Sequence, residues 1–337
     1  MQKILVIRFD ALGDSILTLP LLSTLKKSYS DAEITVITSN RGKEVFENCS
    51  FIDKLEIADN NDKQLLRTLT AKIKTAKYDI SINVSEKIEG YKLAYNAKIP
   101  IRVGFCPGPV QPIKDILCRV YLTHPVLYDN NPNINKHLHE IERQFLLLNA
   151  LGIAEPPTDY FFEIPKEAEL FAENFVKNKC LSLHLSQKWL LDGWDENFLC
   201  MLLDVILEKY SDLHLIVTYG PAETSLAQQI KDLNKNSRAI FFTDPSFWKW
   251  ISVLKKTRAL VTMDTSASHV AAGLNLPCIV VFGEKYFDRT VERWHPWKSN
   301  YRAIKRIVRP KGDLDDVSLM EENFIKSILE AIEVFLT

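Results

Sequence analysis

The sequence predicts an α/β fold built from two doubly wound parallel sheets, one in each half of the chain. Short apolar runs alternate with helical stretches along both halves, as in βαβ units. The length of 337 residues exceeds the usual size of one domain. A stretch at residues 152–167 contains Pro156, Pro157 and Pro165, which discourage regular structure. We therefore expect a domain boundary near residue 165.

The first half contains four strand-like runs, at residues 4–7, 32–38, 54–59 and 78–84. Helical patterns are expected over residues 14–29, around 43–48 and through residue 74. Pro20 lies too deep in the first of these helices to be a first-turn proline, so we expect a kink there.

The second half repeats this alternation. Strand-like runs occur at residues 180–186, 213–220, 239–243, 259–264 and 278–283, with amphipathic helices between most of them. We expect a first domain of residues 1–165 and a second of residues 166–320. Residues 321–337 have apolar side chains at helical spacing, so this C-terminal helix should pack on an apolar surface, with the first domain as one option.

Composition excludes several classes of protein. Lys plus Arg number 42 and Asp plus Glu number 43, which argues against binding nucleic acid through phosphate neutralisation. No window has the 18 or so apolar residues of a membrane span, and the amino terminus does not resemble a secretory signal. The six cysteines are scattered without metal-binding spacing. We expect reduced thiols in a cytoplasmic protein.

The stretch RFDALGDSILTLP, residues 8–20, follows the first strand and has only one glycine. It is neither the dinucleotide fingerprint nor the phosphate-binding loop, which disfavours a nicotinamide oxidoreductase. Gly13 would permit a tight turn from strand to helix, and Asp14 would then lie at the helix start. There it could cap free amides, or it could act as a general base. Asp10 would supply a second polar contact.

A second informative stretch, residues 261–283, begins as a strand that ends at Asp264. Small and hydroxyl residues follow and lead into a helix whose start could bind a phosphate. The alternative is an N-capped core helix with a buried histidine. The residues concerned are Thr265, Ser266, Ala267, Ser268 and His269.

Three further positions carry charged side chains of interest. Glu223 follows a strand and a Gly-Pro turn, where it could hold ribose hydroxyls or cap a helix. Lys188 could meet a diphosphate or be an ordinary surface lysine. Arg102, together with Lys87, Lys114 and Arg119, could meet phosphate or acidic sugars of a lipid-linked glycan, or be a solvated charge.

Four segments in register, RFDALGD, RVGF (102–105), HEIERQFLLLNALG (139–152) and DTSASHVAAGLNLPCIVVFG (264–283), together resemble the heptosyltransferases of glycosyltransferase family 9. The resemblance implies a GT-B fold, with two Rossmann-like domains facing across a cleft. The first domain would receive the acceptor, and the second would hold a nucleotide-sugar, ADP-heptose in the best-known members. The implied reaction is inverting transfer to a hydroxyl of the lipopolysaccharide inner core, with no metal or cofactor.

The resemblance also implies roles for single residues. Asp14 would be the catalytic base. The residues themselves make Asp10, Gly13 and Arg102 candidates on the acceptor side. In the second domain Asp264 would contact the donor sugar, the turn 265–269 the diphosphate and Glu223 the ribose.

The chain departs from the family pattern at two positions. Ser266 stands where glycine is usual, and Asp192 replaces the usual lysine two residues before a tryptophan, a role for which Lys188 is a substitute. Another nucleotide-sugar donor and a non-catalytic sugar-nucleotide-binding relative remain alternatives. The implied location is the cytoplasm, with peripheral contact at the inner membrane as an option.

Overall fold

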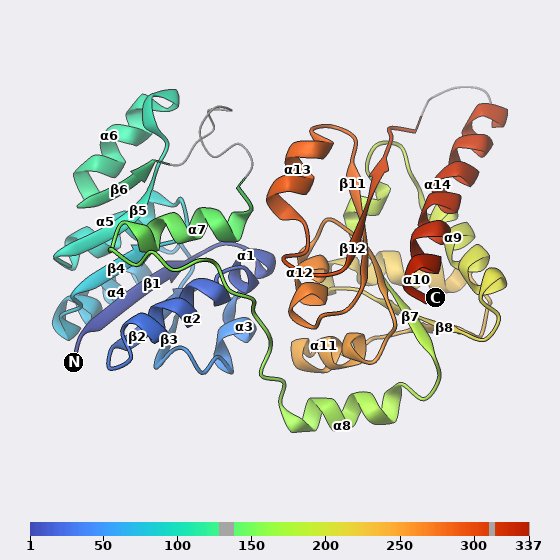
Figure 1. Ribbon diagram of the computed structural model, residues 1–337, viewed down its shortest axis with the longest axis horizontal. Helices are drawn as coiled ribbons and strands as arrows, with labels where there is room; N and C mark the ends of the chain where they lie inside the picture. Colours follow the sequence, from blue (N-terminus) through green and yellow to red (C-terminus); the bar gives the residue numbers. More distant parts are fainter. Residues whose placement is uncertain (128–137, 310–313, 337) are drawn as a thin grey trace. The chain divides into compact units, whose positions relative to one another are not determined.

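The computed structural model describes residues 1–127, 138–309 and 314–336, so Thr337 of the expected C-terminal helix lies outside the described residues. Contacts divide the chain into two compact units, Met1–Glu163 and Ile164–Thr337 (Figure 1). The sequence placed this boundary at residue 165.

The first unit contains a six-stranded parallel sheet of order β3-β2-β1-β4-β5-β6. Its central strand is fully apolar between Ile4 and Ile7, and these side chains are buried on both faces of the sheet. The strands are β1 (Lys3–Arg8), β2 (Glu33–Thr38), β3 (Lys54–Ile57), β4 (Ile80–Asn83), β5 (Ile101–Cys106) and β6 (His124–Leu127).

Helices connect these strands as parallel pairing requires. They are α1 (Leu12–Ile16), α2 (Leu19–Ser28), α3 (Lys43–Glu47), α4 (Lys63–Ala76), α5 (Ile88–Asn96), the 3-10 turn η1 (Gly108–Val110), α6 (Pro112–Tyr121) and α7 (Glu140–Asn149).

The second unit contains another six-stranded parallel sheet, of order β12-β11-β10-β7-β8-β9. The strands are β7 (Cys180–His184), β8 (His214–Thr218), β9 (Ala239–Phe241), β10 (Leu260–Met263), β11 (Cys278–Gly283) and β12 (Tyr301–Arg306). The helical elements are α8 (Lys166–Phe175), η2 (Gln187–Leu190), α9 (Glu196–Lys209), η3 (Pro221–Glu223), α10 (Thr224–Leu233), α11 (Phe247–Lys255), α12 (Ser266–Gly273), α13 (Phe287–Trp294) and α14 (Leu314–Leu336).

The two sheets share one topology. In each, the first strand lies between the second and the fourth strands of its unit, so the chain leaves this position in opposite directions. Doubly wound sheets bind ligands at this switch point, beyond the carboxyl ends of the strands. The switch points are the β1/β4 pair in the first unit and the β7/β10 pair in the second.

The predicted fold class is confirmed, and each expected strand is present. The sequence did not indicate β5, β6 and β12 as strands. The apolar run of β5 is interrupted by Arg102 and Gly104, whereas β6 and β12 are edge strands with polar or charged residues and a half-exposed surface. All six cysteines are free thiols.

The helix expected over residues 14–29 is divided into α1 and α2. Thr18 is the N-cap of α2, and Pro20 lies in its first turn. The expected kink is therefore wrong. Pro20 is the second residue of a new helix, where its missing amide hydrogen leaves no hydrogen bond unmade.

The C-terminal helix α14 packs within the second unit, against α9, β11 and β12. The ring of Phe324 stacks on that of Phe198, with centroids 5.4 Å apart, and lies 5.0 Å from the ring of Trp194. These contacts show where its apolar face is buried. In the described part of the chain, no helix has the length and apolar character needed to cross a membrane.

Candidate active site

The switch point of the first unit carries a cluster of charged and hydroxyl side chains. Ser85, just past β4, donates from Oγ to Asp10 Oδ2 at 2.5 Å and accepts from the amide of Phe9 at 2.7 Å. Arg8 ends β1 and donates from Nη1 to the carbonyl of Val84 at 3.0 Å. These bonds tie the ends of β1 and β4 together.

Arg8 also holds Asp14. Its Nη2 donates to Asp14 Oδ1 at 2.8 Å, and its Nη1 lies 3.4 Å from Asp10 Oδ2. The side chain of Arg8 is almost fully buried, and that of Asp14 is 27% exposed. One buried guanidinium therefore fixes two carboxylates at the β1/β4 switch point.

The pKa of Asp14 is raised above its usual value. Burial is the main cause, and the charges of Asp10 and Glu140 act in the same direction, whereas Arg8 opposes the shift. A raised pKa makes a carboxylate a stronger base, which suits general base catalysis. The capping alternative is realised in part, because Asp14 lies in the first turn of α1 and a backbone hydrogen bond from Ala11, the N-cap residue, lowers the pKa of Asp14.

Arg8→Gln is expected to move the acidic limb of the activity profile to higher pH. Arg8 lowers the pKa of Asp14, so its removal raises that pKa, and a base is lost as pH falls through its pKa. The pH dependence of kcat/KM measures this. Arg8→Lys keeps the charge and should leave the limb near its original position. An unchanged limb in Arg8→Gln would show that Asp14 does not control it.

A second ion-pair group lies nearby on α7. Arg143 pairs with Glu140 at 2.9 Å and with Glu86, which follows β4, at 2.5 Å. Its guanidinium carbon lies 4.6 Å from the ring centroid of Phe105. The segment HEIERQF therefore anchors α7 to the end of the sheet. Glu140 also acts electrostatically on Asp14.

Gly13 and Arg102, two residues predicted on the acceptor side, differ from what the sequence led us to expect. Gly13 is a helical residue of α1, and its φ is not in the left-handed region, so the turn does not require glycine for that reason. Arg102 pairs in register with Ser81 and lies level with Leu5, three residues before Arg8. Its Nε donates to the carbonyl of Tyr121 at 2.6 Å. The structure does not bring Arg102 to the edge that carries Asp14.

In the second unit, the switch point brings Lys188 and Asp264 together. Lys188 lies on η2 after β7, and Asp264 follows β10. Lys188 Nζ donates to the backbone carbonyl of Asp264 and lies 3.6 Å from its Oδ2. The pKa of Asp264 is raised, because burial outweighs the opposing charge of Lys188. Lys188 is thus a residue of this edge rather than an isolated surface lysine.

The turn 265–269 forms the start of α12. Thr265 is the N-cap, and its Oγ1 accepts from the amide of Ala267 at 3.3 Å. Ser268 Oγ donates to the carbonyl of Thr265 at 2.7 Å. Ser266 has no positive φ, so the backbone does not need the glycine that the family uses there. His269 is buried against Trp294, with ring centroids 6.3 Å apart.

Glu223 ends η3, after β8, and is the N-cap of α10. Its side chain makes no capping hydrogen bond. The capping alternative is therefore not realised, and Glu223 remains a candidate for contact with a ribose.

Asp192 faces a buried arginine. Arg306, the last residue of β12, donates from Nη2 to Asp192 Oδ2 at 2.9 Å, so the carboxylate is paired. The same guanidinium donates from Nη1 to the carbonyls of Lys188, at 2.6 Å, and Trp189, at 3.2 Å. Arg306 therefore fixes the turn that carries Lys188.

Sequence reasoning missed Arg8, Ser85 and Arg306. Arg8 ends the largely apolar strand β1, and Arg306 ends the edge strand β12. An arginine at the end of a strand was the available signal for both residues. Ser85 had no signal in the sequence, because its partner Asp10 is distant along the chain.

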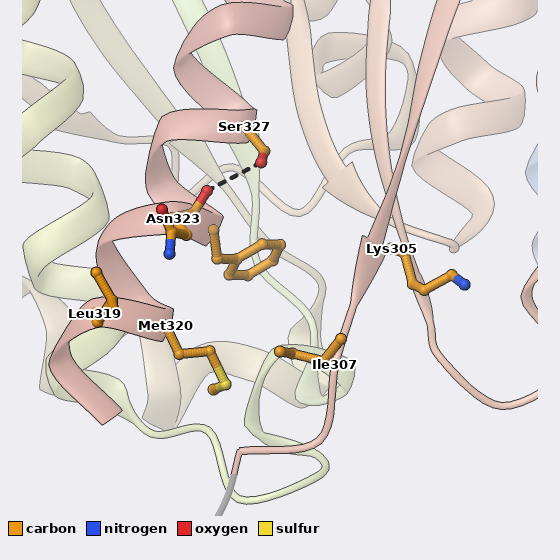
Figure 2. Close-up of a pocket in the computed structure, with 7 residues that line it drawn as sticks. Lys305, Ile307, Leu319, Met320, Asn323 and Ser327 are labelled. Carbon is orange, nitrogen blue, oxygen red and sulfur yellow. Dashed lines mark hydrogen bonds between the residues drawn. The ribbon is translucent and has the colours of Figure 1, made fainter. Parts of the chain in front are cut away.

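Figure 2 shows a pocket elsewhere in the second unit, beside α14, in which Ser327 Oγ donates to the carbonyl of Asn323 at 2.9 Å. None of the predicted site residues lines it. Its lining residues are Lys305, Ile307, Leu319, Met320, Asn323, Phe324 and Ser327.

Two doubly wound units of this kind make up the GT-B fold, and the chain matches solved structures of that fold over nearly its whole length. The model of glycosyltransferase family 9 (heptosyltransferase) matches residues 66–322, more than half of the chain. The chain therefore belongs to glycosyltransferase family 9.

Individual relatives are distant but similar over their full length. A lipopolysaccharide heptosyltransferase 1 of Campylobacter coli is 22% identical, over 98% of each chain. The family 9 structure from Veillonella parvula has a TM-score of 0.79 at 18% identity, covering 99% of this chain and 97% of that chain. The ADP-heptose lipopolysaccharide heptosyltransferase II of Escherichia coli has a TM-score of 0.74 at 16% identity, covering 98% and 100%.

Proposed function

We propose that this glycosyltransferase moves heptose from ADP-heptose to a sugar hydroxyl of the lipopolysaccharide inner core, with inversion and with Asp14 as general base. The observation that carries the proposal is the pairing of one carboxylate with one cation at each switch point, Asp14 with Arg8 and Asp264 with Lys188. The name of the Escherichia coli relative, which includes ADP-heptose and lipopolysaccharide, supports this choice of donor and acceptor.

The acceptor hydroxyl would pass its proton to the carboxylate of Asp14 as its oxygen attacks the anomeric carbon. The bond from that carbon to the diphosphate oxygen breaks, and ADP leaves with the electron pair. Lys188 and the amides at the start of α12 would stabilise the growing negative charge, which is fixed electrostatic stabilisation of the transition state.

The remaining residues of the second unit would bind the donor. Asp264 would accept hydrogen bonds from hydroxyls of the sugar, and Glu223 would do the same for the ribose. The turn 265–269 would face the diphosphate. Asp10 would position the acceptor beside Asp14. A lipid-borne acceptor would place the enzyme at the cytoplasmic face of the inner membrane.

The experiment is an ADP-release assay with heptose-deficient lipopolysaccharide as acceptor, preceded by thermal shifts with ADP, UDP and GDP. A ligand at 100 times its Kd stabilises the fold by about 2.7 kcal/mol. Selective stabilisation by ADP, with turnover of ADP-heptose, supports the proposal. Selective stabilisation by UDP or GDP would indicate another donor. Binding of ADP without turnover would indicate a non-catalytic relative.

Lys188→Ala is expected to raise the KM for the donor about 10- to 100-fold, because a hydrogen bond to a charged group contributes about 1.5–3 kcal/mol. Initial rates at varied donor concentration measure the effect. Lys179→Ala is the matched control, since Lys179 is an exposed lysine of the same unit that pairs with Asp212. An unchanged KM in Lys188→Ala would remove this lysine from the donor site.

A further inference from the structure

The helix α6 presents its apolar side chains to solvent. Ile113, Ile116, Leu117 and Val120 follow the spacing of one helix face, and all four are exposed. Ile113 is 78% exposed and Ile116 is 62% exposed. A helix that covers a sheet normally turns such a face inward. In α6 the apolar face points to solvent instead of to the sheet.

The inward side of α6 carries the carboxylate of Asp115 and the buried thiol of Cys118. Asp115 Oδ1 accepts from Cys106 Sγ at 2.7 Å and from the amide of Gly108 at 2.9 Å. Cys118 is fully buried in a small cluster beside β5. These contacts fix the rotation of α6 about its axis. Because of this rotation, Ile113 and Ile116 point to solvent.

Neighbouring segments extend the apolar surface. Val110, on η1, and Leu127, at the end of the edge strand β6, are both exposed. Leu127 lies against Gly108, because a Cβ placed on that glycine would be 3.3 Å from the Leu127 side chain. We define the α6 patch as Val110, Ile113, Ile116, Leu117, Val120 and Leu127. Figure 1 shows α6 next to β6 in the first unit.

The chain around the patch is basic. Residues 87–127 contain six Lys and Arg and two acidic residues, a net charge of +4, whereas the whole chain has a net charge of −1. One of the two acids is Asp115, which is turned inward and also pairs with Arg119 at 2.7 Å. Tyr95 and Tyr121 form an edge-to-face pair with centroids 5.4 Å apart, and the guanidinium carbon of Arg102 lies 5.5 Å from the ring centroid of Tyr95. Apolar, tyrosine and basic side chains together are typical of proteins that lie on a membrane surface.

We propose that the α6 patch docks on the surface of a phospholipid bilayer that contains anionic lipid. The aliphatic side chains enter the boundary between headgroups and acyl chains, and the surrounding lysines and arginines interact with anionic headgroups. The cations favour an anionic surface over a second copy of this chain, whose patch would carry the same positive charge. The proposal does not rest on heptosyl transfer, because membrane binding needs no substrate.

The experiment is sedimentation of the full chain with vesicles of phosphatidylcholine alone and of phosphatidylcholine with phosphatidylglycerol, at low and high salt. We expect binding to the anionic vesicles that weakens at high salt. The double variant Ile113→Ser/Ile116→Ser should bind them at least about tenfold more weakly, because two large aliphatic side chains are lost from the contact. Leu65→Ser is the matched control on α4, at a position that is 38% exposed, and should bind like the wild type.

Three results of the sedimentation experiment would overturn the proposal. They are no sedimentation with anionic vesicles, equal sedimentation of the double variant and the wild type, and equal binding to vesicles with and without anionic lipid. Light scattering provides an independent measurement. A dimer that becomes a monomer in the double variant would assign the patch to contact between copies and would also overturn the proposal. None of these outcomes depends on ADP-heptose turnover, so failure here is distinguishable from failure of the proposed reaction.

Discussion

Asp14→Asn is expected to lower kcat about 10²- to 10⁴-fold, the range of general base catalysis. The amide has nearly the same shape as the carboxylate and can still accept from Arg8, which holds Oδ1 at 2.8 Å, but it cannot take a proton from the acceptor hydroxyl. The measurement is ADP release at saturating donor and acceptor, with a thermal melt to show that the variant is folded.

Asp10→Asn is the matched comparison, since Asp10 belongs to the same cluster and accepts from Ser85. We expect a smaller loss, because positioning of the acceptor affects KM more than proton transfer does. A loss below tenfold in Asp14→Asn, in a folded protein, would exclude Asp14 as the base. If kcat fell by a larger factor in Asp10→Asn than in Asp14→Asn, the base would be Asp10.

Arg306→Met is expected to lower the free energy of unfolding by about 2–5 kcal/mol. The side chain of Arg306 is 2% exposed, and its loss leaves the carbonyls of Lys188 and Trp189 without their donor. It also leaves Asp192 without its cation. Urea denaturation measures the change. Because the turn that carries Lys188 is no longer fixed, the KM for the donor should rise as well.

Two variants separate this interpretation from general damage to β12. Arg302→Met removes an exposed cation from the same strand and should change stability by about 0.5 kcal/mol or less. Asp192→Asn removes the charge of a side chain that is 41% exposed, so we expect a loss of about 1 kcal/mol or less. If Arg306→Met were as stable as Arg302→Met, Arg306 would have no role in fixing the turn.

The ion pair between Arg306 and Asp192 explains how the chain accommodates an aspartate where the family usually has a lysine. In the sequence, an aspartate at the position of a lysine suggests repulsion of a diphosphate. In the structure its charge is paired with Arg306, and Lys188 is held against Asp264. The sequence could not show this, because Asp192 and Arg306 are 114 positions apart and Lys188 and Asp264 are 76 positions apart.

The fold class and the interior strands other than β5 follow from local pattern. Runs such as Ile4 to Ile7 are apolar on both faces, and a strand with this pattern is stable only in a covered parallel sheet. The edge strands β6 and β12 escaped prediction, because each has one side that needs no burial, whereas the edge strands β3 and β9 were predicted. The break between α1 and α2 was not predicted either, because the apolar spacing of residues 14–29 is compatible with one continuous helix.

The sequence by itself determined two doubly wound units and the aspartates that follow their strands, because periodicity and turn chemistry act between near neighbours. Only the tertiary structure decided which charges meet. It placed Arg8 on Asp14, Lys188 on Asp264 and Arg306 on Asp192, and it turned the apolar face of α6 outward. These outcomes depend on the register of parallel strands and on the rotation of a packed helix, which long-range packing sets.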